Sequence, residues 1–452
     1  MVTISAIDQD PSAETETSRT VKWLIAIFFV TVFIPGSLNV GVRMTPYRLF
    51  LIVMAIPMLL RFRADPQMRV TLVDLLMFCA TAWRAIALLV NHHTAELVNA
   101  GSTFMELFFG YLFGRVYLRS AADFRFFFRC FLATLVAFMP FALVELVLRK
   151  ELLRTLFGLV LEQPATNIRT QDFRFGLMRV QLSFDHAVLF GTFCAMGFAN
   201  VYYIFRDRFP LNLAFMGFVG LMCLTALSSS SILVMGLQIG LIGYAAAFGW
   251  LPYRWAVLGV TTLFLWYGFE IVFSKSVVDF VAQDLVYNTT GAETRMDQVS
   301  YGLKEIASHP FFGVGLNQIA LPFWRGTVID NFWLATAVRY GLPALAFTIL
   351  AFVAQFLCVA AAKGLDETET RYRLGYMITF ATTMLIIGTM SIWGVSLVYV
   401  MAYVGMGSWF YDRRPPGVLR RSAPGSPVRV AGGRAAPARP PRRSLESRRV
   451  SR

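Results

Sequence analysis

The chain has 452 residues, of which 57% are hydrophobic and only 15% are charged. Ordinary soluble domains carry about 25% charged residues, and a soluble fold of this composition would expose large apolar patches to water, so the composition excludes an ordinary soluble protein. The formal net charge of +14 gives no reason to expect a nucleic-acid partner, because residues 413–452 hold twelve arginines against one acidic residue and so carry +11 of it.

The hydrophobic residues are gathered in long runs between residues 21 and 411. A helix needs about 20 apolar residues to cross the hydrocarbon of a bilayer. We therefore expect an all-α polytopic membrane protein with about 12 transmembrane helices, or roughly 10 if the weakest runs do not cross. The candidate runs are 21–41, 44–60, 70–90, 96–118, 124–148, 184–205, 211–227, 230–248, 253–273, 332–362, 372–391 and 393–411.

The basic residues predict the orientation of this bundle, because cytoplasmic loops carry an excess of Lys and Arg. Most basic residues lie inside if the polar segment 1–20 is cytoplasmic, so we expect both termini inside and the protein in a bacterial inner membrane. Segment 1–20 shows no cleavable signal peptide. Residues 412–452, rich in Pro, Gly, Ala, Ser and Arg, are expected to form a disordered cytoplasmic tail that contacts anionic lipids.

Two of the loops are long, 149–183 and 274–331, and both are predicted to be periplasmic and to contain short helices. Long loops in a compact protein are usually functional. The first carries several arginines, among them Arg174 and Arg179. Guanidinium groups suit phosphate, because they give two parallel charge-assisted bonds and stay protonated. The alternative, anchoring to lipid headgroups and salt bridges within the loop, fits Arg154 well because it lies on an amphipathic stretch.

The second long loop ends at Asp330 and Asn331, directly before the apolar run 332–362. These residues are candidates for chemistry at the outer face. They are also explained as a helix N-cap with an acid that compensates the helix dipole, and the two roles are compatible. Within the bundle, Arg84 and Glu106 lie on consecutive runs, and we expect them to pair with each other or to face an aqueous cavity, because charges inside a membrane are costly.

Residues 295–343 combine several short motifs, namely Arg295, the turn HPFFGVG, the helix start DNFWL and the segment RYGLP. This order resembles the signature loop of the O-antigen ligase and O-antigen and exopolysaccharide polymerase superfamily, whose members are polytopic membrane glycosyltransferases. The segment from Arg179 to His186 is similar to that family's first arginine, which is followed by a short turn into a helix. The hydropathy plan, with its large late periplasmic loop, is also similar.

The resemblance implies roles for individual residues. Arg179 and Arg295 would bind the pyrophosphate of an undecaprenyl-linked glycan and neutralise charge as the sugar–phosphate bond breaks. Asp330 stands where the family has a histidine, and it would be the catalytic base that takes the proton from the acceptor hydroxyl, as carboxylates do in other sugar-transfer enzymes. Because the ligases depend on that histidine, the departure favours a polymerase.

Four more residues are assigned to substrate binding by the same resemblance. Relatives often carry Ser-Arg where this chain has only serine, at residues 228–231, so we expect Arg174 or Arg339 to replace the missing arginine. Asn331 and His186 would hydrogen-bond the substrate. For His186 the alternative is a helix cap.

These features predict a metal-independent, cofactor-free, inverting glycosyltransferase that polymerises or transfers undecaprenyl-pyrophosphate-linked glycan units at the periplasmic face, for exopolysaccharide or O-antigen synthesis. Its expected partners are the lipid-linked donor, a glycan acceptor, anionic lipids and other polysaccharide-assembly proteins. No Walker loop, GxGxxG or HExxH motif supports ATP-driven chemistry or zinc hydrolysis. The alternatives are a transporter or flippase for lipid-linked oligosaccharide, a ligase that acts on lipid A core, and a scaffold.

Overall fold

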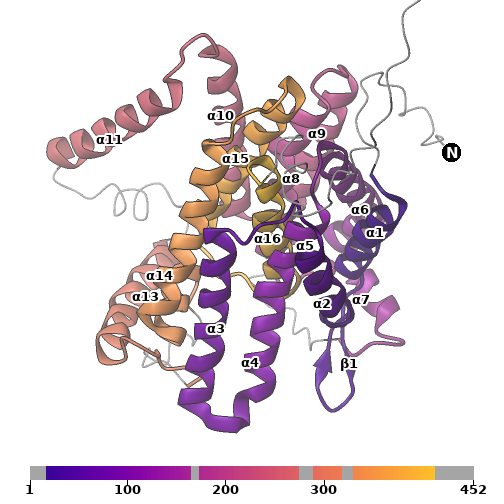
Figure 1. Ribbon diagram of the computed structural model, residues 1–452, viewed down its shortest axis with the longest axis vertical. Coiled ribbons are helices and arrows are strands. Elements are labelled where there is room, and N and C mark those ends of the chain that lie inside the picture. Colours follow the sequence, from indigo (N-terminus) through magenta and orange to yellow (C-terminus); the bar gives the residue numbers. More distant parts are fainter. Residues whose placement is uncertain (1–16, 164–172, 274–288, 318–328, 413–452) are drawn as a thin grey trace, which may run out of the picture. The chain divides into compact units, whose positions relative to one another are not determined.

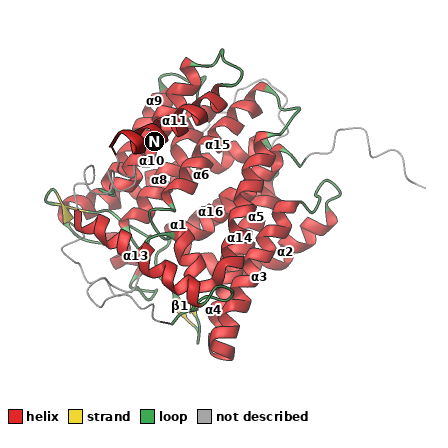
Figure 2. Ribbon diagram, turned by 90° about the vertical axis from the view of Figure 1, so that its left-hand side faces the viewer, coloured by secondary structure: helices red, strands yellow, loops and turns green. Residues whose placement is uncertain are grey.

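The computed structural model describes residues 17–163, 173–273, 289–317 and 329–412, and within these ranges the chain is mostly helical (Figures 1 and 2). Strands occur in the described part only as two short antiparallel hairpins. The first half contains α1 (Arg19–Phe33), β1 (Leu38–Asn39), β2 (Arg43–Met44), α2 (Pro46–Ala64), α3 (Leu72–His92), η2 (His93–Glu96), α4 (Leu97–Phe104), the π-helical turn η3 (Met105–Phe109), α5 (Gly110–Tyr117), α6 (Ala121–Leu148) and α7 (Leu152–Phe157).

The second half continues with two strands and then helices only. Its elements are β3 (Phe173–Arg174), β4 (Leu177–Met178), α8 (Ala187–Ile204), α9 (Leu211–Thr225), α10 (Ser229–Ala247), α11 (Arg254–Phe273), α13 (Thr289–Ser308), α14 (Phe332–Ala360), α15 (Glu367–Ile386), α16 (Gly394–Met406) and η7 (Gly407–Phe410). Each of the twelve predicted runs therefore contains a helix in the structure.

Five of the described helical stretches are long and apolar enough to cross a membrane: Leu72–Tyr117, Ala121–Leu148, Ala187–Ile204, Ser229–Ala247 and Phe332–Ala360. In the first of these, α3 and α4 pack side by side and the chain reverses between them (Figure 1). The apolar helices α9 and α16 are shorter. The fold is thus compatible with a multi-pass membrane protein, and a count of about twelve crossings stays a prediction.

Two helix boundaries differ from the sequence prediction for local reasons. The first run was predicted to extend to residue 41, but α1 ends at Phe33, because Pro35 follows and Gly36 has a φ of +97°, which a helix cannot accommodate. At the other end of the chain, α15 begins five residues before residue 372. Asp366 caps it there in a capping box with Glu369.

Helix α16 forms the centre of the core, since every residue from Val395 to Met406 is buried. Its closest neighbour is α5, and the contact depends on glycine at two positions. A Cβ at Gly114 would lie 1.9 Å from the carbonyl oxygen of Ala402, and one at Gly405 would lie 2.0 Å from that of Tyr111. Small residues of this kind let two helix backbones approach closely.

Buried charges at the predicted inner end tie the termini of several helices together. Arg115, which is fully buried, forms ion pairs with Asp74 of α3 at 3.0 Å and with Asp412 at 2.6 Å. Tyr111 donates a hydrogen bond to Asp74 at 2.6 Å. Asp412, which the sequence analysis assigned to the tail, is therefore part of the folded bundle.

The predicted pair between Arg84 and Glu106 is wrong. Arg84 instead donates to Thr336 and Thr348 of α14, at 3.1 and 3.2 Å, because α3 packs along α14. Glu106 lies in the π-helical turn η3 and binds Arg48 of α2. An inserted residue in a π-helical turn changes which side of a helix the following side chains occupy, and apolar runs alone do not reveal it.

Candidate functional site

A polar pocket lies at the predicted outer end of the bundle, close to α7 and to the hairpin β1–β2. Its cavity has a volume of about 330 Å³. Three arginines and two carboxylates line it: Arg43, Arg48, Arg154, Glu106 and Asp185. They come from segments that are far apart in the sequence, and we refer to this cavity as the outer pocket.

One wall of the outer pocket is an ion pair supported by a tyrosine. The Nε of Arg48 donates to Oε1 of Glu106 at 2.7 Å, and the hydroxyl of Tyr47 donates to the same oxygen at 3.2 Å. Glu106 is buried, whereas the side chain of Arg48 keeps 23% of its surface exposed. Arg48 also holds β2 in place, since its Nη1 donates to the carbonyl of Arg43 at 3.1 Å. The pair is neutral overall, and its guanidinium is the partner that stays partly exposed.

The loop that carries Asp185 is fixed by two buried charges. Arg154 donates from Nε to the carbonyl of Leu182 at 2.9 Å and from Nη2 to that of Phe184. Glu145 accepts the main-chain N–H groups of Gln181 and Leu182. Arg154 is only 5% exposed, so it does not anchor the loop to lipid headgroups, but its Nη1 lies 3.8 Å from Oε2 of Glu151, as expected for a salt bridge within the loop. It orders the backbone directly before Asp185.

The start of α16 also lines the outer pocket. Trp393 is 40% exposed, and Gly394 has a φ of +60°. A Cβ at Gly394 would lie 2.9 Å from Oδ2 of Asp185, so the chain passes very close to that carboxylate. An exposed indole ring beside carboxylates offers an apolar face to the C–H groups of a sugar and polar partners to its hydroxyl groups.

Arg174 and Arg179 meet at the segment before α10. Arg174 donates to the carbonyl of Leu227 at 2.9 Å and to the hydroxyl of Ser229 at 3.1 Å. Arg179 is buried and donates to the carbonyl of Ala226 at 3.3 Å. Arg174 therefore contacts the serine-rich segment 228–231 directly, and Arg179 contacts the main chain just before it. Neither of them lines the outer pocket.

Two of the predicted site residues act as helix caps. His186 caps α8 by accepting the N–H of Val188 at its Nδ1, at 3.2 Å. Asn331 caps α14 by accepting the N–H of Leu334 at 3.0 Å. The capping alternative is confirmed for both, and a role in substrate binding stays a prediction for each.

Asp330 is exposed, and its main-chain N–H donates to the side chain of Gln298 at 2.9 Å. Gln298 lies on α13, one helical turn after Arg295, so the two motif segments are neighbours in space. The side chain of Arg295 lies outside the described part of the chain. That the side chains of Arg295 and Asp330 lie close together therefore stays a prediction.

The motifs HPFFGVG and RYGLP are joined through their main chains. Val314 and Gly315 donate to the carbonyls of Val338 and Arg339 at 2.8 and 2.9 Å, and the N–H of Leu342 donates to the carbonyl of Pro310 at 2.7 Å. Arg339 also donates from Nη1 to the carbonyl of Gly315 at 3.4 Å. This junction fixes residues 310–315 against α14.

Gly341→Ala is expected to disrupt this junction. Gly341 has a φ of +83°, and a Cβ there would lie 2.0 Å from the carbonyl oxygen of Phe311. Because the carbonyl oxygen belongs to the main chain and a Cβ cannot rotate away from it, the two segments must separate. We expect a fall in thermal stability in detergent of several degrees, from a cost of about 1–3 kcal/mol or more. Gly240→Ala, at a position with open space, is the control and should leave stability unchanged; equal stability of both variants would contradict the role of the junction.

One of the two motif segments also borders the outer pocket. Ser183 and Asp185, within the segment from Arg179 to His186, line it directly. On the other side, the hydroxyl of Ser391 donates to the carbonyl of Ile329 at 2.6 Å. This bond links the residue before Asp330 to the wall that contains Trp393.

No family model and no curated protein matches this sequence. The family resemblance therefore rests on the short motifs alone, and the geometry of the outer pocket has to be judged by its own chemistry. Within the described ranges, no three His, Cys, Asp or Glu side chains are placed to hold a metal ion.

The sequence analysis did not select Arg43, Arg48, Asp185 or Trp393. One signal was present for the two arginines, since basic residues on a predicted outer loop run against the usual charge distribution. Asp185 directly precedes His186 and was passed over for it. Trp393 stands at a break between two apolar runs, and nothing in its local pattern distinguishes it from an interfacial anchor.

Proposed function

We propose that this protein is a glycosyltransferase of a bacterial inner membrane that polymerises or transfers undecaprenyl-pyrophosphate-linked glycan units at the periplasmic face, with both termini cytoplasmic. The observation that carries the proposal is the outer pocket, where guanidinium groups, carboxylates and an exposed indole ring line one cavity. A lipid-linked glycan donor offers the matching groups, namely a pyrophosphate and sugar hydroxyls. The motif resemblance supports the same chemistry independently of the pocket.

The proposed reaction is a direct displacement. An acceptor hydroxyl attacks the anomeric carbon of the donor sugar, the bond from that carbon to the pyrophosphate oxygen breaks, and the electron pair leaves with the lipid pyrophosphate. The anomeric configuration is inverted, and the hydroxyl proton passes to a carboxylate. Arg43 and Arg48 are placed to neutralise the leaving group, because a guanidinium has five N–H donors in a fixed fork.

Two carboxylates are candidates for the base. Asp185 lines the outer pocket beside the arginines, and we assign it the role. Asp330, which the resemblance favours, does not line the outer pocket and is the alternative. Arg179 and Arg295 remain proposed ligands of the pyrophosphate. The remaining proposed substrate contacts are Arg174, His186, Asn331 and Arg339.

The lipid-linked glycans of a deletion strain test this function. Loss of a polymerase or ligase is expected to leave single glycan units on the lipid carrier in the outer leaflet, accessible to an added glycosidase or lectin. Re-expression of the intact chain should restore polymer or transferred glycan. Units trapped on the inner leaflet would indicate a flippase instead, and an unchanged glycan profile would rule out both activities.

A further inference from the structure

A tight turn leads into the part of the chain that lines the outer pocket before α8. It runs from Gln181 to Phe184 and is closed by a hydrogen bond from the main-chain N–H of Phe184 to the carbonyl of Gln181, at 3.0 Å. Leu182, its second residue, has a φ of +53°. Turns with a positive φ at this position favour glycine, asparagine or aspartate, and a leucine there is strained. The surroundings must therefore hold the turn in this shape.

The shape of the turn decides which side chains face the cavity. Leu182 and Phe184 are both fully buried. Ser183 and Asp185 alternate with them and line the outer pocket. The hydroxyl of Ser183 also donates to the carbonyl of Val32 in the last turn of α1, at 2.7 Å. A relaxed turn would disturb this alternation, so the position of the Asp185 carboxylate depends on the conformation of the residues before it.

Glu145, near the end of α6, holds the turn through its main-chain N–H groups. One carboxylate oxygen accepts the N–H of Gln181 at 2.8 Å, and the other accepts that of Leu182 at 3.3 Å. Glu145 is 1% exposed, so bulk water does not compete for these bonds. Arg154 binds two carbonyl groups of the same turn, but it also lines the outer pocket, whereas Glu145 does not. Any effect of Glu145 on a bound substrate therefore passes through the turn.

We propose that Glu145 is a positioning residue for Asp185, an inference that rests on the proposed function, in which Asp185 is the base. The buried carboxylate binds the two N–H groups, keeps Leu182 in its left-handed conformation and thereby directs Asp185 toward the acceptor hydroxyl. A misplacement of about 1 Å at a reacting group costs about 100-fold in rate. The strain at Leu182 is thus part of how the site is ordered before the substrate binds.

Glu145→Gln tests this role, because the amide keeps the size of the carboxylate and replaces one acceptor oxygen with a donor. We expect kcat of glycan transfer to fall about 30–100-fold, while KM for the donor lipid changes less than about threefold, because the arginines of the pocket lie on other segments. Hydrogen–deuterium exchange at the N–H groups of Gln181 and Leu182 should become faster. Glu145→Asp keeps the buried charge and is one methylene shorter, so it should show the same pattern with a smaller loss.

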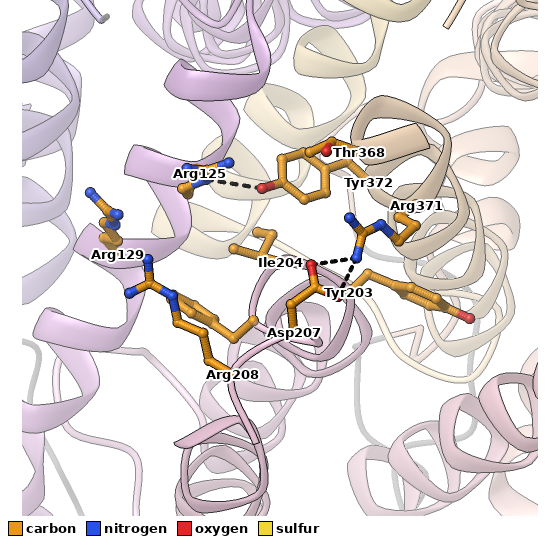
Figure 3. Close-up of a pocket in the computed structure, with 10 residues that line it drawn as sticks. Arg125, Arg129, Tyr203, Ile204, Asp207, Arg208, Thr368, Arg371 and Tyr372 are labelled. Atoms are coloured by element: carbon orange, nitrogen blue, oxygen red, sulfur yellow. Dashed lines mark hydrogen bonds and ion pairs between the residues drawn. The ribbon is translucent and has the colours of Figure 1, made fainter. Parts of the chain in front are cut away.

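Asp123→Asn is the matched control. Asp123 is also a buried carboxylate of α6 that accepts a main-chain N–H, that of Arg119 at 3.2 Å. It lies about 33 Å from Glu145 along the helix, at a rise of about 1.5 Å per residue. Figure 3 shows this predicted inner end of α6, where Arg125 donates to Tyr372 of α15 beside a separate, smaller pocket. The control should leave kcat unchanged within about twofold, and a loss equal to that of Glu145→Gln would overturn the proposal.

The double variant Glu145→Gln/Asp185→Asn shows whether the two residues act together. If Glu145 acts through Asp185, the double variant should transfer glycan as slowly as Asp185→Asn alone. Losses that multiply, or a Glu145→Gln variant that keeps full kcat while Asp185→Asn is inactive, would overturn the positioning role and leave the proposed function intact. Full activity of Asp185→Asn would instead refute the proposed mechanism, and the positioning role with it.

Discussion

Asp185→Asn is expected to lower the rate of glycan transfer about 100-fold or more, because a positioned base contributes about 10²–10⁴-fold to a proton transfer. The amide keeps the size of the carboxylate, so the close contact with Gly394 should persist. The measurement is the initial rate of polymer formation by membranes that contain equal amounts of each protein, with donor lipid extracted from the deletion strain. Melting temperatures of the purified proteins show whether the variant folds as the original does.

Asp330→Asn provides the comparison. Asp330 is exposed, and within the described residues it is its main-chain N–H that makes a hydrogen bond, to Gln298. Its replacement should therefore change the rate by less than about threefold, well below the contribution of a base. If the effects are reversed, Asp330 is the base and the family resemblance identified it correctly. If neither variant loses activity, neither carboxylate takes the proton and the proposed mechanism is wrong.

Arg48→Met is expected to have the second large effect, on stability and activity together. It leaves Glu106 buried without its charge partner, which typically costs about 3–5 kcal/mol. We therefore expect a clear fall in the apparent melting temperature in detergent, together with loss of transfer from the outer pocket. Arg63→Met on the same helix is the control, because Arg63 is exposed and should be replaceable.

The double variant Arg48→Met/Glu106→Gln separates the two effects. Glutamine is neutral and retains an oxygen that accepts from Tyr47, so most of the lost stability should return. Transfer should remain lost, since the guanidinium is still missing. The coupling measured in this cycle isolates the pair. A double variant that recovers transfer would show that Arg48 only stabilises the fold, and a single variant as stable as the original would show that the pair contributes nothing.

Much of the helical layout could be predicted from the sequence, because run length and apolar content determine which segments are helical in lipid. The run 253–273 matches α11, and 332–362 matches α14 within two residues at its end. The boundaries that failed depend on short-range geometry, as at Pro35 and Gly36. The pattern of apolar residues does not reveal the π-helical turn at Glu106, so the predicted partner of Glu106 was wrong.

The candidate site was predicted only in outline. Among the described residues, the motif segment from Arg179 to His186 contributes Ser183 and Asp185 to the lining of the outer pocket, whereas the segment from Arg295 to Pro343 contributes none. The motifs named Arg179 and Asp330, and the cavity is lined by Asp185 and Arg48. Which residue of a loop faces a cavity depends on tertiary contacts, such as those of Arg154 with two carbonyl groups. Such contacts join residues that are about 30 positions apart in the chain, beyond the reach of local periodicity.

The burial of α16 on all sides has a consequence for how a growing saccharide could be accommodated. Trp393 and Gly394 stand at the start of α16, whose backbone approaches that of α5 closely at Gly114 and Gly405. The side of the cavity that they form therefore cannot move without repacking of the core. The lining also includes Arg43 of β2, which is exposed. Under the proposed function, the tryptophan side of the pocket would therefore keep one position for glycans of every length.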